Sequence, residues 1–388
     1  MDGSKRKPGT RQDTATGLIC SMTPSLDGEL EKQSYSLGAR WIHTMLDAPL
    51  ENHWINITEG NVESISPKPA YVSQYLGERS TLLPTTINAH AHLELSQLDA
   101  PLDVPSRSMS DWVVALLAFR RSADYDAEQG IQQALCRPEF LASTGAVADV
   151  VPASVCRLPS AVCRLLPFTE LIAWRSELVK DVPHSFGLSP HAPNTVCPPL
   201  LEKAVSRNVP IAMHLAETWE ELELLRCHTG PLLEMMWHAD PDYDPKSVLL
   251  GKRPMDYLQL LSVAPKAFII HGNYLDDEEL RFLAAHRETM SVVYCPRSHA
   301  YFRHSPYPLQ KMLDYGVRVL LGTDSLASTP DLSIVKEMEF VLKQHPTLSA
   351  ETVYRLGTFE GAVAFDLCRE GLGTIQSGSP ARFATAEE

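Results

Sequence analysis

Two histidines, His90 and His92, are the first residues of this chain whose types and spacing could carry out chemistry. They follow the apolar run 81–84 and are two residues apart, and residues with that spacing on a β-strand point to the same face. If the strand ends there, both imidazoles can reach one metal ion from its C-terminal end. A lone His-x-His pair is weak evidence, so this interpretation depends on whether the rest of the chain supplies more ligands.

Further apolar runs also end in a residue that can bind a metal. These residues are His191, His214, His271 and Asp324, with Glu217 three positions after His214. Five of the 14 histidines therefore stand at run ends. Neutral imidazoles and a carboxylate are ligands for Zn²⁺ or Fe²⁺, and a metal with an open position makes hydroxide from water near neutral pH. Glu217 lies close enough to His214 to move protons as a general acid/base without being a ligand.

Strand-like and helical patterns alternate from residue 82 onward, which indicates parallel βαβ units. The strand candidates are 82–90, 145–151, 161–168, 185–190, 209–214, 267–271, 291–296 and 317–323. The helical patterns include 111–121, 170–180, 199–207, 220–227 and 276–286, and two more follow the last strand over 331–345 and 349–368. Eight repeats over about 240 residues match a (β/α)8 barrel, in which active sites lie at the C-terminal ends of the strands. A doubly wound open sheet is the alternative, although no Gly-x-Gly-x-x-Gly follows any strand.

The composition divides the chain into three parts. Residues 1–35 are rich in Ser, Thr, Gly, Asp and Lys and are predicted to be a disordered extension. Residues 36–81 and 369–388 are predicted to build a small β-sandwich, to which 373–378 contributes a strand and turn. Residues 82–368 are the predicted catalytic domain, an α/β protein of the TIM-type (β/α)8 class.

The bulk properties limit the partners of the protein. The net charge of −14 argues against binding to nucleic acid or to an anionic membrane surface, so a small-molecule substrate is expected. No apolar run approaches the roughly 20 residues that cross a bilayer. The eight cysteines form no Cys-x-x-Cys pair, and with no signal peptide expected they predict a reducing, cytoplasmic environment. A homodimer is left open.

In their order along the chain, these motifs resemble the amidohydrolase superfamily, in its cytosine-deaminase-like branch of aminohydrolases and chlorohydrolases. The similarity covers about residues 38–380, and the stretches that carry it are Asn88-Ala89-His90-Ala91-His92-Leu93-Glu94, Ser189-Pro190-His191-Ala192-Pro193, His214-Leu215-Ala216-Glu217-Thr218, His271-Gly272 and Gly322-Thr323-Asp324-Ser325. The stretches 295–302 and 324–328 are most similar to the aminodeoxyfutalosine-deaminase-like proteins of this branch.

The resemblance implies a role for each motif residue. One divalent metal is expected, Zn²⁺ with Fe²⁺ as the alternative, because binuclear relatives carry a bridging Lys where this chain has His191. Its implied ligands are His90, His92, His214 and Asp324. His271 is expected to hydrogen-bond the water on the metal, which Asp324 helps to deprotonate. Glu217 is expected to protonate a ring nitrogen of the substrate, and His191 to contact the substrate.

Three further residues are candidate substrate contacts, each with an alternative. Glu94 either contacts substrate or supports His92. Arg297 either binds a ribose or carboxylate group of the substrate or forms a salt bridge within its loop. Ser325 either contacts substrate or fixes the loop that carries Asp324.

The activity that the resemblance implies is hydrolytic deamination of an aminated purine-type nucleoside or nucleobase, with aminodeoxyfutalosine as one candidate substrate and ammonia as a product. One alternative is hydrolysis of another C–N or C–Cl bond, or of a cyclic amide, on the same metal site, as in chlorohydrolases and imidazolonepropionase. The other is a non-catalytic relative that serves as a scaffold. Such relatives usually lose metal ligands, and every expected ligand is present here.

Overall fold

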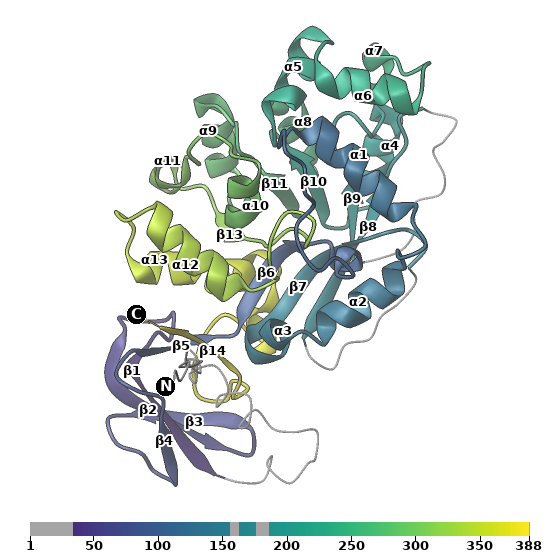
Figure 1. Cartoon of the computed structure of the whole chain (residues 1–388). Coiled ribbons are helices and arrows are strands. Elements are labelled where there is room, and N and C mark those ends of the chain that lie inside the picture. The colour runs from purple at the N-terminus through teal and green to yellow at the C-terminus, as the bar shows by residue number, and fades with distance from the viewer. Residues whose placement is uncertain (1–33, 156–162, 176–185, 388) are drawn as a thin grey trace, which may run out of the picture.

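The computed structural model describes residues 34–155, 163–175 and 186–387. An eight-stranded parallel sheet and a six-stranded mixed sheet organise these residues (Figure 1). The extension predicted over 1–35 lies outside the described residues except for its last two positions, and Tyr35 already begins the first strand.

The eight-stranded sheet is a barrel whose strands neighbour one another in chain order and run parallel. Its strands are β6 (Thr86–Ala91), β7 (Thr144–Val151), β8 (Arg164–Leu171), β9 (Gly187–Pro190), β10 (Ile211–Leu215), β11 (Ala267–His271), β12 (Met290–Tyr294) and β13 (Val319–Leu321). Most are buried along their whole length, as parallel strands covered by helices must be. The predicted (β/α)8 fold class is confirmed.

The first and last barrel strands meet at their C-terminal ends and close the barrel. A parallel bridge joins Ala91 to Asp324, and the backbone N–H groups of Thr323 and Asp324 both donate to the carbonyl of His90, over 3.1 Å. The Asn88 side chain adds a bond from Nδ2 to the Thr323 hydroxyl, over 2.8 Å. This closure brings two motifs that are more than 230 residues apart in sequence to one end of the barrel.

Helices surround the barrel and fill most of the connections between its strands (Figure 1). They are α1 (Met109–Arg120), α2 (Ala127–Leu135), α3 (Pro138–Ser143), α4 (Pro198–Val205), α5 (Trp219–Cys227), α6 (Pro231–Ala239), α7 (Pro245–Val248), α8 (Pro254–Leu261), α9 (Asp277–Ala285), α10 (Pro296–Tyr301), α11 (Leu309–Tyr315), α12 (Ile334–Gln344), α13 (Ala350–Gly357) and α14 (Phe359–Ala364), with 3-10 turns at η3 (Leu93–Leu95) and η5 (Leu367–Glu370). Several begin at a polar residue that caps the free N–H groups of the first turn, such as Ser108 for α1 and Thr218 for α5. No helix in the described ranges has the length and apolar character that a membrane crossing requires.

The strand predicted over 82–90 is wrong as a single element, because two strands of different sheets share this apolar run. The first, β5 (Ser80–Pro84), pairs with strands of the six-stranded sheet, and β6 of the barrel begins at Thr86. Thr85 lies between them outside either strand. Pro84 has no N–H to donate to a sheet, so it favours a strand end at this position.

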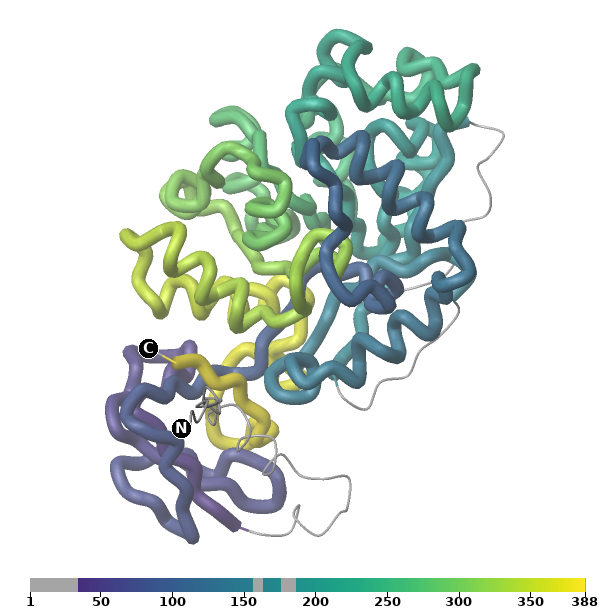
Figure 2. The backbone as a smooth tube through the Cα atoms, viewed as in Figure 1, coloured from purple at the N-terminus to yellow at the C-terminus, as the bar shows by residue number. Residues whose placement is uncertain are grey.

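The six-stranded sheet is built from both ends of the described chain. Its other strands are β1 (Tyr35–Ile42), β2 (Leu50–Thr58), β3 (Asn61–Ser66), β4 (Ser73–Tyr75) and β14 (Phe383–Glu387). The C-terminal segment returns beside the N-terminal strands in Figure 2, where β14 pairs with β5. The strand predicted within 373–378 is wrong: Gly373 and Gly378 adopt φ angles of 84° and 85°, which place turns there, and the strand lies further on.

Two helix predictions are also wrong in part. The pattern 170–180 begins in a strand, because β8 continues to Leu171 and pairs with β9 there; its second half lies outside the described residues. The helix predicted over 349–368 is divided into α13, α14 and η5, with a break at Thr358, whose φ and ψ of −134° and −82° are not helical. The first error arises because pairing with β9 overrides a helical periodicity.

Candidate active site

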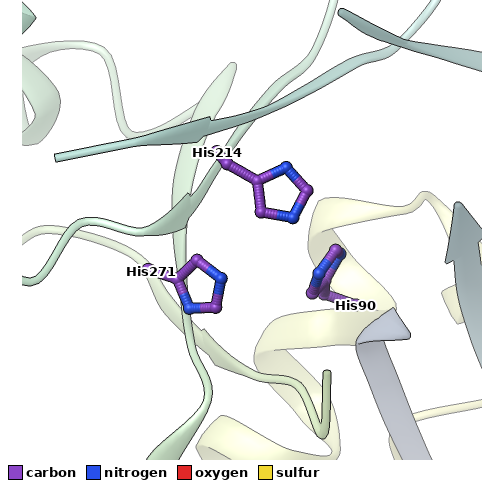
Figure 3. Close-up of side chains that lie close together, drawn as sticks. All are labelled: His90, His214 and His271. Atoms are coloured by element: carbon purple, nitrogen blue, oxygen red, sulfur yellow. The ribbon is translucent and has the colours of Figure 1, made fainter. Parts of the chain in front are cut away.

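Four histidines and one aspartate converge at the C-terminal ends of the barrel strands. This histidine cluster comprises His90, His92, His214, His271 and Asp324, all at most 7% exposed. Two triplets, His90–His214–His271 and His90–His92–Asp324, each have ligand atoms within 4.8 Å of one another. Figure 3 shows the rings of His90, His214 and His271 lying close together, each supplied by a different strand.

The ends of three barrel strands turn sharply where these side chains enter the site. Ala216, His271 and Asp324 have positive φ angles of 54°, 68° and 63°. This left-handed conformation costs a non-glycine residue on the order of 1–3 kcal/mol and persists only where the surrounding structure enforces it. Here the hydrogen bonds that close the barrel hold Asp324. The strain therefore lies at the residues that carry or adjoin the functional groups.

The donor set of the histidine cluster fits a divalent metal. The Nε2 atoms of His92 and His214 lie 3.4 Å apart, which is about the separation of two nitrogens that bind one tetrahedral Zn²⁺ at 2.0–2.1 Å. Nε2 of His90 is buried without a hydrogen-bond partner among the described residues. Nδ1 of His214 bonds the carbonyl of His191 over 2.9 Å, which leaves Nε2 free to bind a metal.

Burial keeps the cluster histidines neutral, which is the state that binds a metal. Burial, and then the neighbouring imidazoles, lowers the pKa values of His90, His92 and His271 well below 6.5. The same causes lower the pKa of His214 to about 3. Each ring therefore offers a lone pair at neutral pH.

Asp324 is oriented by two serines. Its Oδ2 accepts hydrogen bonds from the hydroxyls of Ser298 and Ser328, over 2.7 and 2.8 Å, while Oδ1 lies 3.8 Å from Nε2 of His90 and 3.9 Å from Nε2 of His92. Burial raises the pKa of Asp324 to about 6, and the two serine hydrogen bonds oppose this rise. One carboxylate oxygen is thus fixed by the protein and the other faces the histidines.

Glu217 contacts the cluster through His271, with 3.3 Å between Oε1 and Nε2. Burial, and then the negative charge of Asp324, raises the pKa of Glu217 well above its usual range. The loop that carries it is held by Glu221, whose carboxylate accepts the backbone N–H groups of Ala216 and Glu217 over 2.8 and 2.9 Å. A carboxyl group with a raised pKa that is fixed beside the cluster is suited to act as a general acid.

A second polar group, the carboxylate–arginine cluster of Glu94, Arg120 and Glu170, lies next to these histidines. The Arg120 guanidinium bonds Glu94 over 2.6 Å and lies 4.0 Å from Glu170. Burial raises the pKa of Glu94 to about 7, although the charge of Arg120 opposes this rise. Nε2 of His191 lies 4.0 Å from Glu170. The structure thus pairs Glu94 with an arginine that the sequence did not single out.

The two remaining candidate substrate contacts are Arg297 and Ser325. Arg297 donates from Nε to Glu337 over 2.7 Å and from Nη2 to Asp331 over 2.8 Å. It thus forms salt bridges, but with residues of α12 and the segment before it and not within its own loop. The Ser325 carbonyl accepts the backbone N–H of Thr329 over 2.9 Å, within the loop that follows Asp324. The Ser325 hydroxyl is buried without a hydrogen-bond partner in the described part of the chain.

Sequence reasoning missed the residues that hold the functional groups in place: Arg120, Glu170, Glu221, Ser298 and Ser328. Glu170 carried a usable signal, because it stands at the end of the third barrel strand once that strand is extended to Leu171. Ser298 lies inside the conspicuous stretch 295–302. Arg120 gave no signal, since it ends an ordinary helical pattern and its partner Glu94 is 26 residues away.

Comparison with known proteins gives matches of two kinds. The 5-methylthioadenosine/S-adenosylhomocysteine deaminase of Pyrococcus furiosus is 34% identical over 194 residues, which are 47% of this chain and 41% of that protein. The protein of that name from Syntrophobacter fumaroxidans is 26% identical over 356 residues, which are 81% and 75% of the two chains. The chain thus spans less than half the length of the first relative and three quarters of the second.

Solved structures match over nearly the whole fold. Aminofutalosine deaminase from Helicobacter pylori, in complex with methylthio-coformycin, has a TM-score of 0.72 at 19% identity and covers 91% of this chain and 92% of its own. Triazine hydrolase from Arthrobacter aurescens has a TM-score of 0.67 at 16% identity and covers 92% and 87%. At these identities the likeness establishes the fold.

The family described as the amidohydrolase family matches residues 176–386, more than half of the 388 residues. This span includes the strands that supply His191, His214 and His271 and the loop of Asp324. Together with the closed eight-stranded barrel, this match confirms the resemblance that the sequence motifs indicated: the chain belongs to the amidohydrolase family.

Proposed function

We propose that the protein is a metal-dependent hydrolytic deaminase of an aminated purine-type nucleoside or nucleobase, and that it releases ammonia. The observation that carries the proposal is the convergence of four histidines, Asp324 and Glu217 at one end of the barrel. The names of the relatives support the substrate class, since they act on 5-methylthioadenosine, S-adenosylhomocysteine or aminofutalosine.

In this proposal one divalent metal is held by His90, His92, His214 and Asp324. The fit of these donors supports it: two imidazole nitrogens lie 3.4 Å apart, and one oxygen of the carboxylate faces the rings. Zn²⁺ suits this ligand set, and Fe²⁺ is the alternative. When bound, such a metal lowers the pKa of water toward neutrality and so supplies the nucleophile.

Glu217 and His271 manage the protons of the reaction. Hydroxide adds to the ring carbon that carries the amino group, and Glu217 donates its proton to the adjacent ring nitrogen. His271, in contact with Glu217, orients the attacking oxygen by a hydrogen bond. Asp324 then accepts the proton that this oxygen still carries. That proton passes to the amino group, the C–N bond breaks, and ammonia leaves while a carbonyl forms. General acid/base help of this kind contributes about 10²–10⁴-fold to the rate.

His191 and Ser325 are the proposed substrate contacts beside the metal ligands. His191 stands at the end of β9 with its ring centroid 4.8 Å from that of His214. The Ser325 hydroxyl is without a partner in the described ranges and can accept or donate a bond to a ligand. Arg297 is assigned to its salt bridge with Glu337 instead.

The test is turnover by the purified protein with its metal content measured. Ammonia release would be followed with aminodeoxyfutalosine, 5-methylthioadenosine, S-adenosylhomocysteine, adenosine, guanine and cytosine. We expect one metal per chain and release from at least one adenine nucleoside. A chlorinated triazine is the matched alternative substrate, and chloride release without ammonia release would favour a chlorohydrolase. Protein without stoichiometric metal and without turnover would favour the non-catalytic alternative.

The compartment and the assembly stay predictions of the sequence. A cytoplasmic location is inferred from the scattered cysteines, six of which are free thiols in the described ranges. Size-exclusion chromatography with light scattering would decide whether the protein is a monomer or a homodimer.

A further inference from the structure

The loop that carries Glu217 packs against the loop that follows His271. These loops continue from the neighbouring strands β10 and β11. The Ala216 carbonyl accepts the backbone N–H of Tyr274 over 3.0 Å, and the ring centroids of Trp219 and Tyr274 are 4.5 Å apart. This packing brings Glu217 near His271, but by itself it does not fix the rotation of the Glu217 peptide group.

One side chain of the second loop, that of Asn273, bonds Glu217 directly. Its Nδ2 donates to the Glu217 carbonyl over 2.8 Å. This bond fixes the orientation of the amide, because a backbone carbonyl can only accept and the amide nitrogen is the only donor in the side chain. At the opposite end of the residue, Glu221 accepts the Glu217 N–H over 2.9 Å. The backbone of Glu217 is thus held at both its N–H and its carbonyl, each by a side chain.

Stability does not account for an amide at position 273. Asn273 is 8% exposed, and its Oδ1 is buried without a hydrogen-bond partner among the described residues. The side chain therefore satisfies one acceptor, the Glu217 carbonyl, while it buries another, and this exchange brings little net stability. What the amide does contribute is a fixed position for the Glu217 backbone.

The position of this backbone decides where the Glu217 carboxyl group lies. Oε1 of Glu217 is 3.3 Å from Nε2 of His271, and proton transfer requires the carboxyl group to stay within hydrogen-bond reach of the reacting atoms. A misplacement of about 1 Å in an active site can cost about 10²-fold in rate. Because Asn273 lies two residues after His271, its bond ties the Glu217 backbone to the segment that carries His271.

From these contacts we propose that Asn273 is a positioning residue that holds Glu217 against His271 through the Glu217 carbonyl. The inference rests on the proposed deaminase function, in which Glu217 donates a proton, and extends it to a residue that acts through Glu217. Asn273 takes no part in binding substrate or metal. Its loss should therefore lower kcat and leave KM unchanged, and this effect should disappear once Glu217 can no longer transfer a proton.

The first test measures kcat and KM for the nucleoside that the wild type turns over fastest. Asn273→Ala should lower kcat by about 10–10²-fold, with KM within about twofold of the wild-type value and the metal content unchanged. Asn273→Thr keeps a similar volume but ends one atom short of the Glu217 carbonyl, so it should act in the same way. Asn56→Ala is the matched control. It removes an amide that is 1% exposed in the six-stranded sheet, so it should lower stability and leave kcat unchanged.

A double-mutant cycle separates positioning from a general structural role. In the Glu217→Gln background, Asn273→Ala should change kcat by less than about twofold, because residues that act as a unit are not additive. Glu128→Gln, on the exposed face of α2, is the control background, in which Asn273→Ala should lower kcat as much as in the wild type. An equal loss in all three backgrounds, or an unchanged kcat in Asn273→Ala, would overturn the proposal.

If the wild type releases no ammonia from any nucleoside, the deaminase function is wrong, and hydrogen exchange tests the positioning separately. Mass spectrometry of the peptide 215–219 would follow the backbone amides of Ala216 and Glu217. In Asn273→Ala these amides should exchange roughly tenfold faster, since one hydrogen bond that closes the loop is lost, whereas Asn56→Ala should leave them unchanged. Wild-type exchange in Asn273→Ala would exclude Asn273 as the residue that holds Glu217.

Discussion

The histidine cluster and the carboxylate–arginine cluster lie side by side at the end of the barrel, but the chain holds them by different means. Every member of the first lies at or within four residues of the end of a barrel strand, and hydrogen bonds between β6 and the residues after β13 fix Asp324. The second takes Arg120 from the last turn of α1 and Glu94 from the short turn η3, and only Glu170 comes from a strand.

This difference separates two tasks. Metal binding needs atoms placed within a few tenths of an ångström, which strand ends of a closed barrel provide. Substrate selection can be carried by helices and turns in the connections between strands, because these connections can change without disturbing the barrel. The geometry of the histidine cluster should therefore depend little on α1, whereas the geometry of the carboxylate–arginine cluster should depend on α1 directly.

Removal of the metal should have the largest effect on activity, and this effect should arise at the histidine cluster alone. Dialysis against a strong chelator is expected to reduce turnover to the level of a protein-free blank, because nothing else in the site makes hydroxide near neutral pH. Adding back one equivalent of Zn²⁺ should restore it. Full activity in protein shown to be free of metal would contradict the assignment of His90, His92, His214 and Asp324 as ligands.

Glu217→Gln should lower kcat by about 10²–10⁴-fold, since a carboxamide cannot transfer the proton. The metal content should stay at the wild-type level because Glu217 is not a proposed ligand. The measurement is steady-state kinetics together with metal analysis of the same sample. Glu128→Gln serves again as the exposed control. A variant with near-native kcat would exclude Glu217 as the proton donor.

Ser298→Ala should weaken metal binding without abolishing it. It removes one of the two hydrogen bonds to Oδ2 of Asp324, and loss of a partner that orients a ligand typically costs 10–100-fold in metal affinity. Competition with a chromogenic chelator would measure this affinity. Ser206→Ala, on the exposed end of α4, is the matched control. Unchanged affinity in Ser298→Ala would mean that Ser328 alone orients Asp324.

The contrast between groups held at strand ends and groups held by helices and turns also explains which parts of the site could be predicted from the sequence. The run-end positions of His90, His214 and His271 were readable because strand periodicity and strand ends leave a local pattern. The pairing of Arg120 with Glu94 was not readable, since it depends on how α1 packs across the barrel and not on either local sequence. The division of residues 80–91 between two sheets was missed for a related reason: one continuous apolar run does not show where a strand changes partners.

The smallest expected effect is that of Ser108→Ala at the N-terminus of α1. The Ser108 hydroxyl accepts the backbone N–H of Asp111 over 3.2 Å, and loss of such a cap costs about 1 kcal/mol of stability. Ser349→Ala removes the equivalent cap of α13, where the hydroxyl accepts the N–H of Thr352 over 3.1 Å, and should cost a similar amount. Urea unfolding would measure both losses.

The helices α1 and α13, which these two variants affect, differ in whether they carry a residue of the carboxylate–arginine cluster. Because α1 ends in Arg120, Ser108→Ala should slightly raise KM for adenosine, whereas Ser349→Ala should leave KM at the wild-type value. Both should keep one metal per chain, since neither helix supplies a ligand to the histidine cluster. Loss of metal from Ser108→Ala alone would show that α1 supports both clusters, and the separation between a strand-held metal site and a helix-held substrate site would then fail.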